Sequence, residues 1–259
     1  MLTDSLIKEI EKTAPLRYAA KWDKSGIQIA APAKDIRHLA VMLDPCLTSV
    51  RAALEQGADF ILTHHPLALT PRFPDEMGEY REVLKMVLQK DITLYSAHTS
   101  LDANPLGPVR WLAQALELTD TQVIEQTGRE NENTGFGFCG NLRQALTQKE
   151  FSSLLKQQGI PAWRKTGSWP EKITRVACCP GSGGSLADMA FSLGAEIYIT
   201  GDIRYHQALE IAPYGLTLDV GHFVLEEKMM SVWAQTLQHE LQGQIQVSFV
   251  AGSDPFFYE

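Results

Sequence analysis

Two stretches of this chain, more than a hundred residues apart, repeat the same local pattern, and this repeat constrains the fold more than any other feature. Gly57-Ala-Asp-Phe-Ile-Leu-Thr63 aligns with Gly194-Ala-Glu-Ile-Tyr-Ile-Thr200. A second pair of matching segments, residues 92–98 and 216–222, follows in the same order, and each of these segments ends in histidine. Two matches in one order indicate two related halves rather than chance.

Each copy of the repeat has the pattern of alternating strands and helices. Apolar runs at residues 39–43 and 174–178 predict a buried strand before each copy, and residues 48–56 and 185–193 predict the helix that follows. Strands joined by helices favour parallel pairing, with helices covering the faces of the sheet. The sequence therefore predicts an α/β fold of two related halves, each with a sheet flanked by helices.

The middle of the chain interrupts this alternation. Residues 129–133 are all polar or charged, and a Gly-Phe-Gly-Phe stretch follows them. Such a change of composition predicts a boundary, with a first half of residues 1–125, completed by residues 223–259, and a second half of residues 126–222. The glycine spacing is not that of a phosphate-binding loop, so the Gly-Phe-Gly-Phe stretch is interpreted as an edge strand.

Charge and composition exclude several classes of protein. The chain has 31 Asp and Glu against 23 Lys and Arg, a net charge of −8, which makes non-specific binding to nucleic acid or to a membrane surface improbable. No apolar stretch approaches the roughly 18 residues that span a bilayer, and the first residues lack the apolar core of a signal peptide. The four cysteines form no C-x-x-C pair that would hold zinc. We expect a cytoplasmic protein with no membrane partner.

The residues that carry chemistry follow the predicted strands in both halves. Ligand sites gather at such strand ends, because the loops there converge on a crevice. Imidazole and carboxylate groups without thiolates suit Zn, Fe, Mn or Ni. Their number on corresponding strand ends predicts a metal site, and a dinuclear one. The candidates are His64, His65, His98, Asp102, Asp202, His206, His222 and Glu226.

Helical spacing supports one pair of these candidates, while simpler interpretations stay open for others. In a helix, His222 and Glu226 lie about 40° apart on one face, and Glu227 points about 100° further round. A lone His-x-x-x-Glu is, however, usually a surface pair, and His98 fits a hydrogen-bonded core histidine as well as a metal ligand. His38 lies outside the strand ends and is expected on the surface.

Four motifs, taken in order, resemble those of the Ngg-interacting-factor-like family, whose members are often called GTP cyclohydrolase I type 2 homologs. The resemblance extends from Trp22-Asp23 to Glu226, nearly the whole chain. It implies a two-domain α/β protein that binds two divalent metals per subunit, between the halves, and assembles as a toroidal homohexamer, a trimer of dimers. The motifs are Ile61-Leu-Thr-His64-His65-Pro66-Leu67, His98-Thr-Ser-Leu-Asp102, Thr200-Gly201-Asp202 and Gly221-His222-x-x-x-Glu226.

The resemblance also assigns roles to individual residues. It places His98 beside the metals, where the side chain would transfer a proton as a catalytic residue. The metal identity stays open among Zn, Fe, Mn and Ni. The implied metal ligands are His64, His65, Asp102, His222 and Glu226.

Two functions fit this site. The first is a metal-dependent hydrolase with a small-molecule or nucleotide substrate; with GTP, water would open the guanine ring at C8, and the phosphates would need cations such as Arg204, Arg72 or Lys24. The second is a non-catalytic metal-binding scaffold or protein-interaction module, in which the hexameric ring is the functional feature. An open coordination position favours the hydrolase, and a site filled by protein ligands favours the scaffold.

Overall fold

The computed structural model describes residues 1–128 and 133–256, and its contacts divide the chain into two compact units. The first unit comprises Met1–Asp102 and Met229–Ser253. The second comprises Ala103–Lys228 and the described residues after Ser253. Most of the polar run at residues 129–133, from which a boundary was predicted, lies outside the described residues.

The first unit contains a five-stranded sheet in the order β1-β4-β3-β2-β11. β2, β3, β4 and β11 are parallel, and β1 pairs antiparallel with β4. The strands are β1 (Gly26–Ile29), β2 (His38–Met42), β3 (Phe60–Thr63), β4 (Thr93–Ser96) and β11 (Gln246–Phe249). The helices are α1 (Thr3–Thr13), η1 (Leu16–Tyr18), α2 (Leu47–Glu55), α3 (Glu79–Gln89), α4 (Thr99–Asp102) and the later part of α9 (His222–Glu240).

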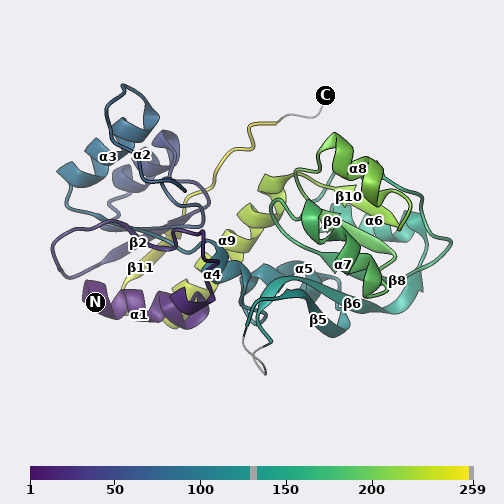
Figure 1. Cartoon of the computed structure of the whole chain (residues 1–259). Helices are drawn as coiled ribbons and strands as arrows, with labels where there is room; N and C mark the ends of the chain where they lie inside the picture. Colours follow the sequence, from purple (N-terminus) through teal and green to yellow (C-terminus); the bar gives the residue numbers. More distant parts are fainter. Residues whose placement is uncertain (129–132, 257–259) are drawn as a thin grey trace. The chain divides into compact units, whose positions relative to one another are not determined.

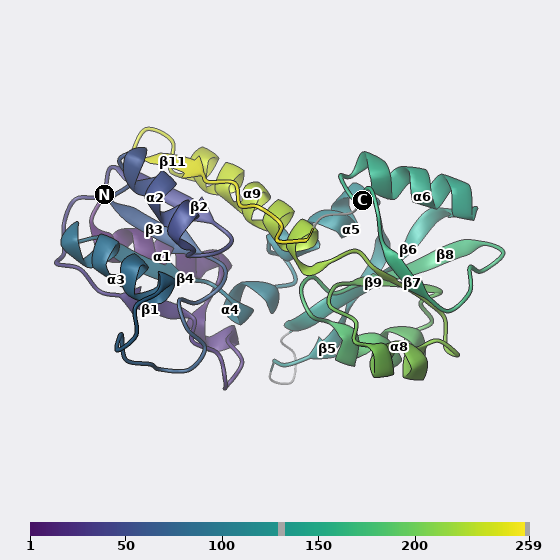
Figure 2. The ribbon, with the colours of Figure 1, turned by 90° about the horizontal axis from the view of Figure 1, so that it is seen from above.

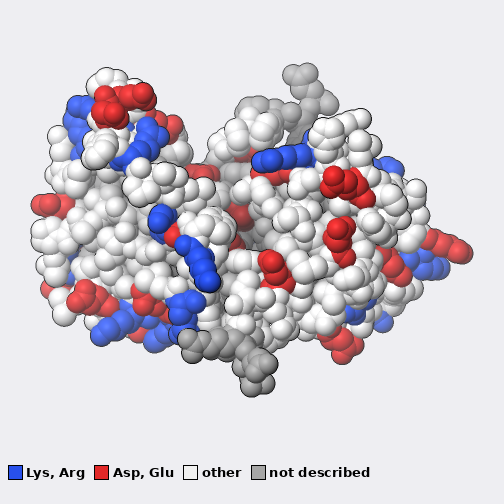
Figure 3. Space-filling model, viewed as in Figure 1, with Lys and Arg blue, Asp and Glu red and all other residues white. Residues whose placement is uncertain are grey.

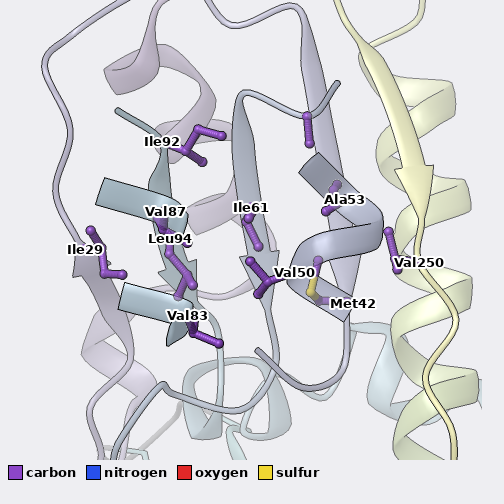
Figure 4. Close-up of a cluster of buried hydrophobic side chains, with 12 residues drawn as sticks. Ile29, Met42, Val50, Ala53, Ile61, Val83, Val87, Ile92, Leu94 and Val250 are labelled. Carbon is purple, nitrogen blue, oxygen red and sulfur yellow. The ribbon is translucent and has the colours of Figure 1, made fainter. Parts of the chain in front are cut away.

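Helices cover both faces of this sheet, with α2 and α3 on one face and α1 on the other (Figure 1). Ile61 and Leu94 point to the first face, where they meet Val50 of α2 and Val83 of α3 in a buried apolar cluster (Figure 4). Tyr95, the next residue of β4, points to the opposite face. Strands buried on both faces read as continuous apolar runs, which is why they are recognisable in the sequence.

The second unit contains a six-stranded sheet in the order β5-β6-β8-β9-β10-β7. β8, β9 and β10 are parallel, and Figure 2 shows α6 and α8 on opposite faces of the sheet. The strands are β5 (Thr119–Gln126), β6 (Gly135–Leu146), β7 (Arg164–Thr166), β8 (Ile173–Cys178), β9 (Ile197–Thr200) and β10 (Leu216–Asp219). The helices are η2 (Pro108–Arg110), α5 (Trp111–Ala115), α6 (Gln148–Gln157), η3 (Gly184–Leu186), α7 (Ala187–Ser192) and α8 (Tyr205–Ile211).

The internal repeat is visible in the topology of both sheets. β2-α2-β3-α3-β4 in the first unit corresponds to β8-α7-β9-α8-β10 in the second. In each unit the strand that precedes this series, β1 or β7, pairs antiparallel with its last strand, β4 or β10. The prediction of an α/β fold with two related halves and helix-flanked sheets is confirmed.

The two sheets differ at their other edges, and there the structure departs from the sequence-based expectations. The Gly-Phe-Gly-Phe stretch begins β6, which lies between β5 and β8, so its interpretation as an edge strand is wrong. The same pairing of β5 with β6 places residues 103–125 in the second unit, whereas the sequence assigned them to the first. β5 is mostly polar and alternates poorly, so the local pattern does not show it as a strand.

The C-terminal strand changes the environment of one histidine. β11 pairs with β2, and His38 is buried with its Nε2 atom 2.7 Å from Oγ of Ser248. The expectation of a surface residue is therefore wrong, because it considered only the neighbours of His38 in sequence.

Two further features concern membrane spans and surface charge. Within the described ranges, no helix combines the length and the apolar character that a membrane span requires. Basic and acidic side chains are interspersed over the face that Figure 3 shows.

Candidate metal centre

In the first unit, the candidate residues follow two neighbouring parallel strands. His64 and His65 come directly after β3, and His98 and Asp102 come after β4. The backbone N–H groups of His64 and His65 donate to the carbonyl of Leu43, 3.2 and 3.0 Å away, at the end of β2. Because the strands are parallel, these residues meet at one edge of the sheet.

The structure brings these side chains together. The ring centroid of His64 is 5.0 Å from that of His65 and 5.2 Å from that of His98, and one nitrogen of each ring lies within 4.8 Å of the others. Nε2 of the fully buried His64 is 3.7 Å from a carboxylate oxygen of Asp102. The first unit therefore holds three imidazoles that could bind a metal ion, with a carboxylate beside them.

Hydrogen bonds orient the two adjacent histidines. Nδ1 of His64 is 2.9 Å from the Ala97 carbonyl, and Nδ1 of His65 is 2.7 Å from the Asp44 carboxylate. Carbonyl and carboxylate oxygens only accept, so each Nδ1 carries the proton and donates it, while each Nε2 carries the lone pair. Metal-binding histidines are held in this way, with one ring nitrogen tied to an acceptor and the other directed at the metal.

His98 is held in the same manner by a loop near the N-terminus. Its Nδ1 donates to the buried carboxylate of Asp23, 2.8 Å away, and its backbone N–H donates to Ser25 Oγ. Burial alone would raise the pKa of Asp23, but hydrogen bonds from His98, Ser25 and Thr99 outweigh it and hold this pKa well below the ordinary value. Asp23 is thus an anion that positions His98 and balances any positive charge on its ring.

The second unit places its candidates at the start of α9. His222 begins the helix directly after the β10 loop, and Glu226 follows one turn later, with its side chain buried. Nε2 of His222 lies 2.9 Å from a carboxylate oxygen of Glu226. The i,i+4 spacing predicted this shared face.

Asp202, after β9, orients His222. Its carboxylate accepts hydrogen bonds from Nδ1 of His222 at 2.8 Å and from Oγ of Ser182 at 2.7 Å. Although burial raises the pKa of Asp202, these two hydrogen bonds lower it below the ordinary value. Its φ of +57° lies in the left-handed region, which Asp tolerates better than most residues. In the first unit too, an aspartate after one strand orients a histidine after the next, Asp44 after β2 and His65 after β3, although these strands are not the ones that correspond to β9 and β10 in the repeat.

Gly181, in the loop after β8, completes this part of the site. Its φ is +69°, and a Cβ atom there would overlap a carboxylate oxygen of Glu226. The backbone can approach the carboxylate closely only because the residue is glycine. Sequence reasoning missed the roles of Gly181, Asp44 and Asp23; the one local signal was their position at or near strand ends.

The residues present fit a divalent metal ion. With the proton of His222 committed to Nδ1, the Nε2 lone pair faces a carboxylate oxygen of Glu226 at 2.9 Å, and two electron-pair donors at that distance need a cation or a proton between them. Nitrogen and oxygen donors without thiolates match Zn, Fe, Mn or Ni. His206, by contrast, is exposed on α8 and packs against the ring of Tyr205.

The Asp202 contact makes a testable prediction. We expect Asp202→Asn to weaken metal binding about 10- to 100-fold, because the neutral amide no longer fixes the tautomer and orientation of the His222 ring. Titration with Zn²⁺ or Mn²⁺ under calorimetry measures the change. The matched control is Asp188→Asn, an exposed carboxylate of α7 in the same unit. Equal affinities of the two variants would show that Asp202 does not support a metal ligand.

Comparisons with known proteins agree with this fold. The family model Duf34/NIF3 (NGG1p interacting factor 3) matches residues 1–255. A GTP cyclohydrolase 1 type 2 homolog of Streptococcus pneumoniae is 32% identical over 232 residues, 86% of each chain. NIF3-like protein 1 of Drosophila melanogaster is 30% identical over 220 residues, 83% of this chain and 74% of that protein. The crystal structure of a Bacillus cereus protein related to NIF3 superimposes with a TM-score of 0.88 at 22% identity, covering 100% of this chain and 99% of the other, and so shares the fold. The chain belongs to the Duf34/NIF3 (NGG1p interacting factor 3) family.

Proposed function

We propose that this protein is a divalent-metal-dependent hydrolase with a dinuclear site and a small-molecule or nucleotide substrate. The observation that carries the proposal is the repeated orientation of histidines at strand ends, each with Nδ1 tied to a carbonyl or carboxylate. The two ions would be Zn, Fe, Mn or Ni. The proposed ligands are His64, His65, Asp102, His222 and Glu226.

Counting ligands supports a site to which both halves contribute. A catalytic metal ion typically has three protein ligands, and five ligands reach that number for two ions if one carboxylate is shared. The second unit offers His222 and Glu226, which are too few by themselves, whereas the first unit offers two histidines and Asp102. We therefore propose that the ligands of the two halves combine to hold both ions.

The residues beside the metals suit hydrolysis. Divalent ions, when bound, supply Lewis acidity and acidify a coordinated water. His98 carries its proton on Nδ1, against Asp23, so Nε2 is the nitrogen that can accept a proton from water or return one to a leaving group. The anionic Asp23 would stabilise the imidazolium that forms. His98 is the catalytic residue of the proposal.

The names of relatives and the positions of cations bear on the substrate. Several relatives are called GTP cyclohydrolase 1 type 2 homolog, which supports a nucleotide. The sequence offered three cations, of which Lys24 is exposed in the loop before β1. Arg72 stacks on Tyr80, with 4.3 Å between guanidinium and ring centroid, while Arg204 lines a polar pocket beside Asp202. Arg204 is thus the better candidate for a phosphate contact.

A second candidate function is a metal-binding scaffold or interaction module. The family description, NGG1p interacting factor 3, names an interaction rather than a reaction, which supports this alternative. A homohexameric ring, assembled as a trimer of dimers in the cytoplasm, belongs to both proposals. The scaffold predicts metal binding without turnover of any substrate.

One experiment separates the two functions. Protein purified without chelator is analysed for metals and then tested for hydrolysis of nucleotides, phosphoesters and cyclic amides, with each candidate metal restored in turn. We expect up to two divalent ions per subunit and turnover with at least one substrate class. Metal at this stoichiometry without turnover of any class would favour the scaffold.

His98→Ala tests the proton-transfer role. We expect this variant to keep most of its metal and to lose hydrolysis by a factor of about 10² to 10⁴, the usual contribution of a general acid or base. Metal analysis and initial rates are measured together. His239→Ala, an exposed histidine of α9, is the control. If His98→Ala loses its metal as well, His98 is a ligand; if it loses neither metal nor activity, it is a packed strand-end residue.

A further inference from the structure

The second unit contains a polar pocket of about 530 Å³ next to Asp202. Arg164 and Arg204 both line it, and we propose that this arginine pocket binds a phosphate group of the substrate. The proposal rests on the proposed function for the idea that the bound molecule is a substrate, but phosphate binding itself is measurable without turnover. The pocket is lined by Arg164, Ser182, Ser185, Asp202, Arg204 and Gln207, among others.

The arginine pocket adjoins a proposed metal ligand. Ser182 lines the pocket, and its Oγ atom donates to Asp202 and lies 3.4 Å from Nδ1 of His222. Asp202 contributes a carboxylate to the lining of the pocket, and this carboxylate accepts hydrogen bonds from Ser182 and His222. A ligand in the pocket would therefore lie against the residues that hold His222 in place.

Arg164 is fixed at the edge of the pocket. It faces Asp219 across the antiparallel pair β7 and β10, and its Nη2 group donates to the carboxylate of Asp219 and to the carbonyl of Ile203. Asp219 is buried, so the guanidinium has an anchor on one side. The N–H groups on Nε and Nη1 of the Arg164 guanidinium are donors of the kind that bind an oxyanion.

Arg204 supplies a second positive charge to the pocket. In the part of the chain that the structure describes, no carboxylate forms an ion pair with Arg204. Its backbone N–H donates to Oε1 of Gln207, which holds that amide beside the pocket. Arginine binds phosphate through two parallel hydrogen bonds and keeps its charge at any physiological pH. Guanidinium, hydroxyl and amide donors on several sides suit a tetrahedral phosphate better than a planar carboxylate.

The glycine-rich loop after β8 forms a rigid wall of the pocket. A Cβ atom on Gly183 would lie 2.6 Å from the hydroxyl groups of both Thr200 and Tyr198, so the loop packs directly on β9. Thr200 Oγ1 accepts from the Gly183 N–H, and Tyr198 donates to the Gly183 carbonyl. A wall held by these contacts is preorganised, which lowers the entropic cost of binding.

Calorimetric titration of inorganic phosphate, GTP and guanosine tests the proposal on protein as purified and after chelation. We expect Arg204→Gln to weaken phosphate and GTP binding about 10- to 100-fold, the effect of losing charged hydrogen bonds, and to leave guanosine binding and metal content unchanged. Ser185→Ala, which removes one exposed hydroxyl, should weaken the same two ligands less. The control is Arg143→Gln, an exposed arginine paired with Glu117 at 3.0 Å in the same unit.

The outcomes separate failure of the arginine pocket from failure of the hydrolase. Phosphate binding that is undetectable, or equal in Arg204→Gln and Arg143→Gln, excludes the arginine pocket as a phosphate site. Phosphate binding that disappears on chelation in every variant assigns it to the metals instead. Hydrolysis with an unchanged KM in Arg204→Gln keeps the hydrolase and removes this pocket from substrate binding. Phosphate binding through Arg204 without any hydrolysis keeps the pocket and refutes the hydrolase.

Discussion

Replacing His64 and His65 together with alanine should remove most of the divalent metal that the purified protein holds. Both imidazoles have Nδ1 tied to an oxygen acceptor, so each offers Nε2 as a ligand, and alanine offers none. Loss of two of five proposed ligands leaves too few donors for two ions. Metal analysis by mass spectrometry after gel filtration, in ions per subunit, measures the effect.

The control for this variant is the pair His206→Ala and His239→Ala, which removes two exposed histidines from helices. His64 is fully buried, so its loss also risks the fold, and circular dichroism of the double variant is recorded alongside. The single variant His65→Ala, at a partly exposed position, should be folded and should still lose metal. Full metal retention in a folded double variant would remove both histidines from the site.

Glu226→Gln should weaken metal binding strongly while keeping the shape of the side chain. Two cations close to each other need negative charge to offset their repulsion, and the substitution removes one such charge. The glutamine amide can donate to Nε2 of His222, where the carboxylate now lies at 2.9 Å, so the fold should be retained. Calorimetric titration with Zn²⁺ or Mn²⁺ compares the affinities, and thermal unfolding without metal compares stability.

The choice of control depends on the structure. Glu227, which helical geometry turns away from His222, is not a suitable control, because one of its carboxylate oxygens is buried. Glu210, exposed on α8 in the same unit, is a better match, and Glu210→Gln should bind metal as the unaltered protein does. If Glu226→Gln also binds metal with unchanged affinity, Glu226 is not a ligand.

The strands and helices of the internal repeat were readable in the sequence because they are encoded locally. Buried parallel strands appear as continuous apolar runs, and the i,i+4 spacing of His222 and Glu226 translates directly into a shared helix face. The internal repeat then indicated that the strand ends correspond. These features need only neighbours within a few residues, so a single chain is enough to show them.

Pairings between distant segments required the tertiary structure. β11 pairs with β2 across some 200 residues and buries His38. The polar strand β5 pairs with β6, whose own sequence resembles that of an edge strand. No local pattern specifies such partners, because strand pairing depends on which surfaces meet after the chain has folded.

The orientation of the candidate ligands was also decided by tertiary contacts. Asp23 holds His98 from 75 residues away, and Asp202 holds His222 from 20 residues away. Arg164 and Arg204 converge on one pocket only because β7 pairs with β10. By itself the sequence therefore indicated which side chains are candidates for binding metal. Only the tertiary structure decided which ring nitrogen each histidine presents, because that depends on acceptors contributed by other strands and loops.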